Sequence, residues 1–168
     1  MVIKFVSNSA LEINTAEVPG QQTHYGSPFP LAYVCNTPGT TLDAAVGWAR
    51  AHTGEITAQA AEHGAVFFRG LPLVTAEDFD AFVEAFNLPC FAYNDSYSNA
   101  VRINYTPRVF SANEAPPEVN INLHHEMAQT PRYPSKLFFF CHTAPEVGGA
   151  SSICRSDVLW DQLSSERP

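Results

Sequence analysis

The order of hydrophobic patterns along the chain limits the possible folds more than any other feature of the sequence. The first forty residues offer only short strand candidates, at positions 3–6 and 31–34. Residues 41–63 have helical spacing, and we expect Gly54 to divide them into two helices and Gly64 to end the second. A short apolar run of strand length follows, so helical and extended segments are mixed early in the chain.

A further helix is predicted directly after Thr75, a residue suited to cap it. Glu77 and Asp78 fall in its first turn, where the helix dipole favours acidic groups. We interpret its apolar stripe as core packing rather than as a ligand-binding surface. The stripe consists of Phe79, Phe82, Val83 and Phe86.

Strand patterns dominate the second half of the sequence. Short apolar or alternating runs predict strands at residues 108–111, 120–127, 136–142 and 150–154. Ser156 then begins a short helix. The sequence therefore predicts a fold that mixes helices and strands, with strands still accumulating when it ends.

Charge and composition exclude several classes of protein. The length of 168 residues favours one domain, and a hydrophobic content of 45% excludes a disordered chain. The net charge of −8, from 9 Lys and Arg against 17 Asp and Glu, argues against general nucleic-acid binding. No signal peptide or apolar run of membrane-spanning length is visible, and the four cysteines have no CxxC spacing. We expect a cytoplasmic protein with reduced, partly buried thiols and no membrane partner.

The segment INLHHEM at residues 121–127 carries the candidate chemistry. In a strand, alternate residues share a face, so His124 and Glu126 would converge on one side, with Asn122 beside them. One imidazole and one carboxylate are two of the three ligands that hold non-haem Fe(II) in a 2-His-1-carboxylate site. The triplet alone is weak evidence for such a site, because it also fits a histidine hydrogen-bonded within a sheet beside a solvated glutamate. The other face, predicted to be the core face, carries Leu123, His125 and Met127.

Several segments, in fixed order, resemble the TauD/TfdA-type dioxygenases, and in particular their clavaminate-synthase-like branch, in which the acidic ligand is Glu rather than Asp. The resemblance runs in register over residues 64–168 and is faint before them. Its segments are AVFFRG at 65–70, EDFDAFVEAF at 77–86, RVFSANEAPP at 108–117, LHHEMAQ at 123–129, YPSKLFFFC at 133–141 and PEVGG at 145–149.

The resemblance implies a mainly β fold with flanking helices, of the α+β class. The family fold is a double-stranded β-helix, or jelly roll, in a single domain over residues 1–168. Residues 1–63 would be an irregular and helical lead-in, and residues 64–168 the family-like part. A jelly roll has about eight strands, and fewer are visible here. We therefore expect an incomplete jelly roll and a chain that is a fragment, a truncated product or half of a split protein.

The resemblance also implies an enzyme, an oxidoreductase that depends on Fe(II) and uses 2-oxoglutarate and O₂ as co-substrates. It would oxidise a small amino-acid-like substrate and release succinate and CO₂. Hydroxylation is the usual outcome, and desaturation or ring closure are the other possible outcomes. A complementing chain or a second copy of this chain is a candidate partner.

Carried over residue by residue, the resemblance makes His124 and Glu126 the proximal iron ligands. Ser151 falls where the family commonly has a threonine that helps to hold 2-oxoglutarate; it could equally be a hydroxyl at a turn or strand start. The family's distal histidine ligand and its arginine for 2-oxoglutarate do not occur in this sequence, and His142 is the one substitute ligand considered. The candidate substrate-binding residues are Asn122, Asn113 and Gln129.

Two other classes of function remain open at this point. The chain could be a non-catalytic remnant that kept the fold and acts as a binding or structural module. It could also be a metal-dependent hydrolase or cupin-like enzyme that uses the same ligand types with zinc or manganese. Absence of any His or Arg from a second chain near His124 would favour the remnant, whereas metal content and insensitivity to 2-oxoglutarate would identify the hydrolase or cupin-like enzyme.

Overall fold

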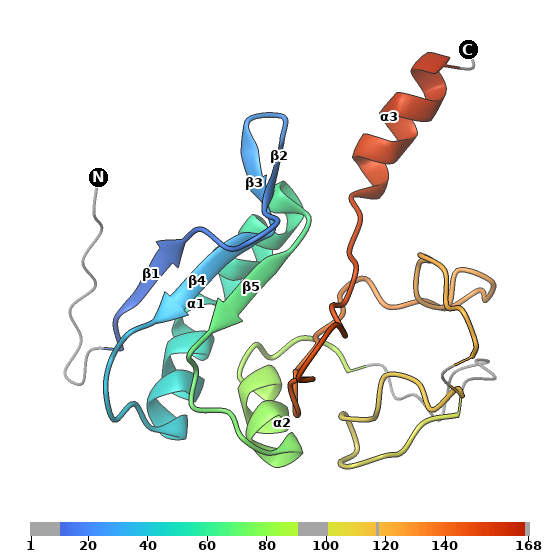
Figure 1. The fold of residues 1–168 in the computed structure, drawn as a ribbon. Coiled ribbons are helices and arrows are strands. Elements are labelled where there is room, and N and C mark those ends of the chain that lie inside the picture. The colour runs from blue at the N-terminus through green and yellow to red at the C-terminus, as the bar shows by residue number, and fades with distance from the viewer. Residues whose placement is uncertain (1–10, 91–100, 117, 167–168) are drawn as a thin grey trace. The chain divides into compact units, whose positions relative to one another are not determined.

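The computed structural model describes residues 11–90, 101–116 and 118–166, and these residues form both helices and strands (Figure 1). The strand expected at residues 3–6 lies outside the described residues. The strands are β1 (Ile13–Ala16), β2 (Gln22–His24), β3 (Ser27–Phe29), β4 (Leu31–Cys35) and β5 (Val66–Arg69). The helices are α1 (Leu42–His63), α2 (Ala76–Glu84) and α3 (Ser156–Glu166).

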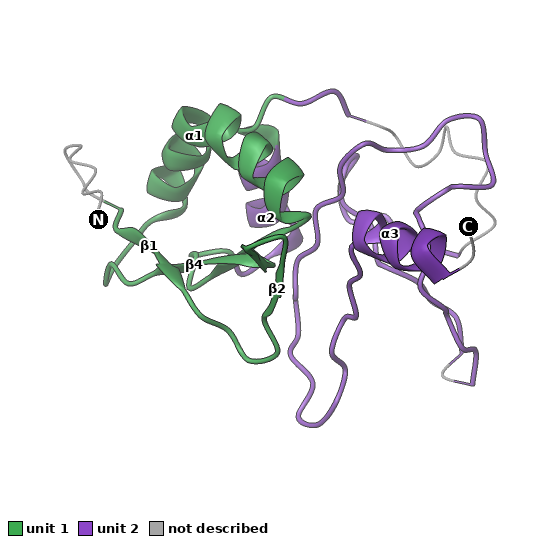
Figure 2. Cartoon of the chain, turned by 90° about the horizontal axis from the view of Figure 1, so that it is seen from above, with its two compact units in different colours: residues 1–73, 84–87 green, residues 74–83, 88–168 purple. Residues whose placement is uncertain are grey.

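The chain divides into two compact units, which Figure 2 shows in different colours. Unit 1 consists of residues 1–73 and 84–87, and unit 2 of residues 74–83 and 88–168. Unit 1 contains the sheets and α1, whereas unit 2 contains α3 and the segment with the predicted site.

Unit 1 is built on a three-stranded sheet with the order β1-β4-β5. Strand β1 runs antiparallel to β4, and β4 runs parallel to β5 with Tyr33 opposite Phe68. A parallel pair needs a long crossover, and α1 supplies it. Strands β2 and β3 form a separate hairpin whose turn residues, Tyr25 and Gly26, both have positive φ, at 53° and 83°. The sequence had indicated β4 and β5, but not β1 or the hairpin.

Helix α1 is one continuous helix, so the expected break at Gly54 is wrong. A single glycine in a helix interior costs only about 1 kcal/mol relative to alanine, which the rest of a 22-residue helix outweighs. Both predicted ends are confirmed, because Thr41 accepts a hydrogen bond from the Ala44 amide and Gly64 ends the helix with a φ of 78°.

The core of unit 1 lies between α1 and the sheet. Ala45, Ala49 and Ile56 are buried on one face of α1, which contacts β3, β4 and β5. Small side chains on this face let the helix approach the strands closely. Aromatic rings then fill the space around β5, with Phe68 stacked on Tyr33 at 5.6 Å and meeting Trp48 edge-on at 5.8 Å.

Helix α2 forms as the sequence predicts. Thr75 Oγ1 accepts from the Asp78 amide at 3.1 Å, and Asp78 Oδ2 accepts in return from the amides of Thr75 and Val74 at 2.9 Å. The hydrogen bonds from the two backbone amides hold the pKa of the Asp78 carboxyl below its usual value, and the bond from Thr75 has the larger effect. The apolar stripe packs as expected, since Phe82 and Phe86 are buried.

The strands predicted in the second half are wrong. Residues 101–116 and 118–166 contain no strand, and the pairing seen there is one isolated bridge between Asn104 and Phe110. Alternation of apolar residues sets which face a strand would bury, but a strand also needs a partner for its amide and carbonyl groups. In the described part of unit 2, the run at residues 108–111 pairs only briefly with residues 103–105, and no pairing is seen for the other runs.

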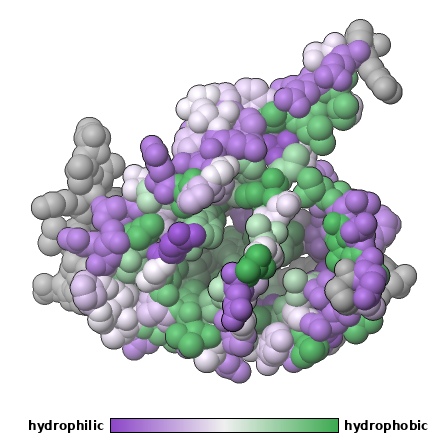
Figure 3. All heavy atoms as spheres, in the orientation of Figure 1, coloured by the Kyte–Doolittle hydropathy of each residue, from purple (hydrophilic) through white to green (hydrophobic). Residues whose placement is uncertain are grey.

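Unit 2 leaves much apolar surface exposed. Helix α3 begins at Ser156 as predicted, but it buries no residue, and Trp160 is 70% exposed. Figure 3 shows apolar residues among the polar ones on this helix. Further large apolar side chains that are exposed in this unit are Val119, Ile121, Leu123, Tyr133, Leu137, Phe138, Phe139, Val147 and Ile153.

The described residues thus form a mixed α and β structure in which more residues lie in helices than in strands. The expectation of a mainly β chain is therefore not met there, and no jelly roll is seen in those residues. None of the four cysteines forms a disulfide, and Cys35 is half-buried while the other three are exposed. Among the described segments, no helix combines the length and apolar character needed to cross a bilayer.

Candidate functional site

His124 and Glu126 lie together in unit 2, although their backbone is irregular rather than extended. His124 Nε2 is 3.7 Å from Glu126 Oε2. A turn over residues 126–129 follows, closed by a hydrogen bond from the Ala128 amide to the His125 carbonyl at 3.2 Å. The next residue, Met127, is buried and has a φ of 59°, so the chain reverses directly after Glu126.

A hydrogen bond to the backbone orients the ring of His124. Its Nδ1 lies 2.7 Å from the backbone carbonyl oxygen of Asn122. A carbonyl oxygen only accepts, so Nδ1 is the donor, and in the neutral ring Nε2 carries the lone pair. Histidines that bind metals are commonly oriented in this way, with the other ring nitrogen donating to a carbonyl group. Nε2, which faces Glu126, is therefore the nitrogen able to bind a metal.

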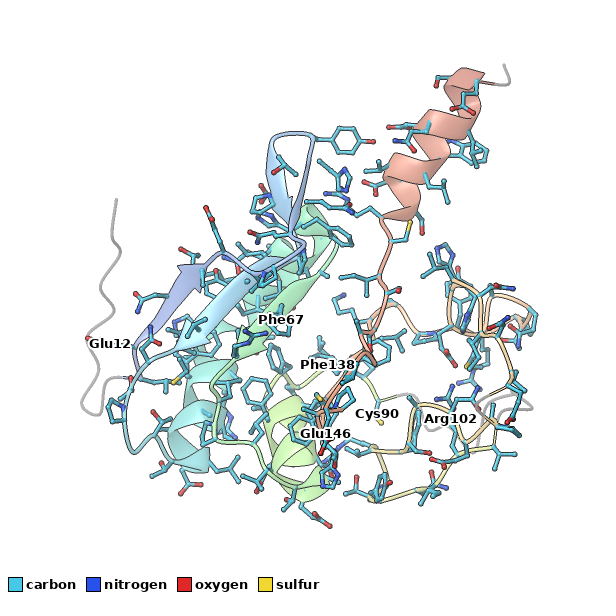
Figure 4. All side chains as sticks on the ribbon, in the orientation of Figure 1. Glu12, Phe67, Cys90, Arg102, Phe138 and Glu146 are labelled. Atoms are coloured by element: carbon cyan, nitrogen blue, oxygen red, sulfur yellow. The ribbon has the colours of Figure 1, made fainter. Side chains whose placement is uncertain are left out.

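Glu126 is held by an arginine that the sequence analysis did not assign to the site. Arg102 Nη2 donates to Glu126 Oε1 at 3.0 Å, and their side chains are 10% and 23% exposed. In Figure 4, Arg102 lies among the irregular loops of unit 2. The one sequence signal for it is a lone arginine between the apolar residues Val101 and Ile103.

Backbone pairing in residues 101–116 sets the position of Arg102. The Ser111 amide donates to the Ile103 carbonyl at 2.9 Å, and the Ile103 amide donates to Ser111 Oγ at 2.9 Å. With the bridge between Asn104 and Phe110, these bonds fold the segment back on itself. Arg102 therefore lies opposite Ser111 on a closed loop.

The other predicted residues lie outside the pair. Ser151 is exposed and follows Gly148 and Gly149, which have φ values of 71° and 67°. Asn113 Oδ1 accepts from the Ala115 amide at 2.9 Å, which makes it a local turn residue. Gln129 is exposed in the 126–129 turn. The structure brings His124 and Glu126 together and shows no contact between this pair and those three side chains.

The expected core face of the predicted strand is only partly correct. Met127 is buried, but Leu123 is 64% exposed and His125 is exposed. Because the segment is not a strand, its residues do not alternate between two faces. His125 Nε2 instead lies 2.5 Å from Ser156 Oγ, at the start of α3.

The pair supplies two donors of the types that divalent metals use. Two metal bonds of about 2.0–2.2 Å at the usual angles between neighbouring ligands place the donor atoms about 3.0–3.4 Å apart, so His124 Nε2 and Glu126 Oε2, at 3.7 Å, would have to move a few tenths of an ångström closer to bind one ion. Within the described residues, no group of three or more His, Cys, Asp and Glu side chains is placed to hold a metal. His142, the substitute ligand considered, lies beside Thr143 and the ring of Phe140.

One hollow elsewhere does not belong to this site. It lies in unit 1, and none of the predicted site residues lines it. Its walls are Leu11, Thr37, Pro38, Gly39, Thr40, Thr41 and Ala44. The candidate chemistry therefore rests on the His124–Glu126 pair and Arg102.

Comparison with known proteins agrees with the resemblance seen in the sequence. The pattern of the taurine catabolism dioxygenase TauD, TfdA family matches residues 27–168. A clavaminate synthase-like protein of Arabidopsis thaliana is 38% identical over 166 residues, an alignment that covers 94% of this chain and 49% of the relative. The chain thus spans about half the length of that protein. The family match over residues 27–168 shows that the chain belongs to the TauD/TfdA dioxygenase family, and the chain is similar to a clavaminate synthase-like member.

Proposed function

We propose that this chain contributes the proximal part of the active site of an Fe(II)- and 2-oxoglutarate-dependent oxygenase. The observation that carries the proposal is the pair of His124 Nε2 and Glu126 Oε2, 3.7 Å apart, within the segment that matches the family. The hydrogen bond from His124 Nδ1 to the Asn122 carbonyl prepares Nε2 as a ligand. The two side chains would hold iron on one side.

When bound, iron would supply the oxidation of a substrate C–H bond, coupled to the conversion of 2-oxoglutarate and O₂ into succinate and CO₂. The chain's own residues would hold the metal and orient the small molecules. We assign metal binding to His124 and Glu126, and 2-oxoglutarate binding to the Ser151 hydroxyl. Asn122, Asn113 and Gln129 are candidates to contact a small amino-acid-like substrate.

We also propose that the family's jelly roll is completed by further polypeptide, in one domain to which residues 1–168 contribute the first part. Support comes from the exposed apolar side chains of unit 2, such as Phe139 at 75% and Val147 at 92%. Large apolar groups at such exposure are typical of surfaces that another segment covers. That segment would bring the remaining ligands, from a longer form of the chain, a complementing chain or a second copy.

The test is a metal titration of the purified chain. Apo protein is titrated with Co(II) by calorimetry, without and with 2-oxoglutarate, and His124→Ala is compared with His142→Ala as a matched control. We expect one Co(II) to bind, His142→Ala to leave binding unchanged, and His124→Ala to remove it. Binding that survives His124→Ala would contradict the proposal. Binding of Zn(II) that does not respond to 2-oxoglutarate would instead favour a hydrolase or cupin-like enzyme.

A further inference from the structure

The side chain of Arg102 is held on several sides before it reaches Glu126. Its Nη1 donates to the carbonyl of Ser111 at 3.2 Å and to the carbonyl of Ala112. Its guanidinium carbon lies 5.3 Å from the centre of the Phe110 ring. Only 10% of the side chain is exposed. The guanidinium therefore has a fixed place, and Nη2 meets Glu126 from one direction.

This contact makes the two oxygens of Glu126 unequal. Oε1 accepts from Arg102 Nη2 at 3.0 Å, whereas Oε2 lies 3.7 Å from His124 Nε2. A divalent cation is repelled by the guanidinium, and the repulsion weakens with distance. A cation that binds His124 is therefore favoured on Oε2 and disfavoured on Oε1.

We propose that Arg102 is a positioning residue that restricts Glu126 to monodentate metal coordination through Oε2. The inference rests on the proposed function, because it concerns the metal that His124 and Glu126 would hold. A bidentate carboxylate occupies one more coordination position than a monodentate one. Sites of this ligand type work by leaving positions open for other ligands, so Arg102 would preserve one of them.

The carboxylate stretching bands in the infrared report this coordination mode directly. Their splitting is wide for a monodentate carboxylate and narrow for a bidentate one. The experiment records difference spectra between the Mn(II)-loaded and apo forms of the whole chain. We expect a wide splitting in the wild type, a narrow one in Arg102→Gln, and a wide one in Arg102→Lys, which keeps the positive charge. Calorimetry should show that Arg102→Gln binds Mn(II) more tightly than the wild type, because the repulsion from the guanidinium is lost.

Two further variants serve as controls. Arg108 Nε donates to Asp80 Oδ1 at 2.6 Å in the same unit, so Arg108→Gln breaks an arginine–carboxylate pair that is distant from Glu126 in sequence. It should leave the wide splitting unchanged. Glu126→Gln, measured at Mn(II) concentrations high enough to load its weakened site, should lack these bands, and this assigns them to Glu126.

The outcomes distinguish failure of the inference about Arg102 from failure of the proposed function. A narrow splitting in the wild type, or a wide one in folded Arg102→Gln, overturns the inference about Arg102. If Arg102→Gln does not fold, Glu126→Asp is used instead, because it withdraws the carboxylate from Arg102 by one methylene group. Glu126→Asp should give a narrow splitting, and a wide splitting overturns the inference. Absence of Mn(II) binding in the wild type, or binding unchanged by His124→Ala, overturns the proposed function itself.

Discussion

Replacing each of two adjacent histidines by alanine separates metal binding from stability. His124 makes a hydrogen bond only two residues away, to the Asn122 carbonyl, and lies 3.7 Å from Glu126. His125 instead meets Ser156 Oγ at 2.5 Å, across 31 residues of sequence. The two substitutions remove the same side chain from neighbouring positions, but they break contacts of different kinds.

The structure sets the size of each effect. The side chain of His124 is 57% exposed and its hydrogen bond reaches a carbonyl only two residues away, so its loss should lower the free energy of unfolding by about 0.5 kcal/mol, the low end for a hydrogen bond. Loss of a direct ligand should weaken Co(II) binding beyond the roughly 10–100-fold that outer-shell changes cause. His125→Ala loses a hydrogen bond worth about 0.5–1.5 kcal/mol, and Co(II) affinity should stay within about twofold.

The assay combines Co(II) calorimetry with urea unfolding followed by circular dichroism, on both variants and the wild type. With a urea dependence of about 1–3 kcal/mol per molar, His125→Ala should lower the unfolding midpoint by a few tenths of a molar or more. His124→Ala should lower the midpoint by no more than this and remove Co(II) binding. If His125→Ala alone removes the metal, the ligand is His125 and the assignment of the pair is wrong.

Three other predictions test the site and the fold. Glu126→Gln keeps the side-chain volume and an oxygen for Arg102 but removes the anion, so Co(II) affinity should fall at least about 100-fold with an unchanged circular dichroism spectrum. Glu146→Gln, an exposed residue with the same charge change, should not alter Co(II) affinity, and a similar loss there would refute the argument. Gly54→Ala should raise the free energy of unfolding by about 1 kcal/mol, because a Cβ there meets nothing within 4 Å in a continuous helix. Gly70→Ala should lower the free energy of unfolding by at least about 1–2 kcal/mol, because Gly70 has a φ of 78° and a Cβ there would lie 2.6 Å from the Cys35 carbonyl oxygen. Urea unfolding in which Gly70→Ala is the more stable of the two variants would contradict the structure. Residues 1–168 incubated with Fe(II), ascorbate, O₂ and 2-oxoglutarate should give no succinate above the free-iron background, because the described residues place two candidate ligands together rather than three. Succinate production that His124→Ala abolishes would show that a third ligand is present.

Helices were the predictable part of the fold because their signals are local. Thr41 and Thr75 accept hydrogen bonds from amides three residues ahead, and Gly64 ends α1 with a positive φ. Each of these signals is complete within four residues of sequence. The prediction of a break at Gly54 was wrong because the low helix propensity of one glycine is outweighed by the long helix around it.

Strands and the arginine contact were not predictable in the same way. A strand requires a partner, and the alternation in residues 120–127 carries no information on whether one is present. Arg102 and Glu126 are 24 residues apart, so no local pattern links them. His124 and Glu126 do lie together, but a turn after Glu126 and its contact with Arg102 hold them rather than the pleat of a strand.

The way in which the pair is held has a consequence for folding. The orientation of the His124 ring depends on a carbonyl two residues away, and the position of Glu126 depends on a loop that closes through hydrogen bonds between Ile103 and Ser111. Neither requires paired strands, so the pair can form in a chain whose described second half has none. Interactions between charged groups in a partly buried site are also stronger than at an open surface, which favours the contact between Arg102 and Glu126 once this loop has closed. His124 and Glu126, the proposed metal ligands, are therefore held together by contacts within residues 101–130.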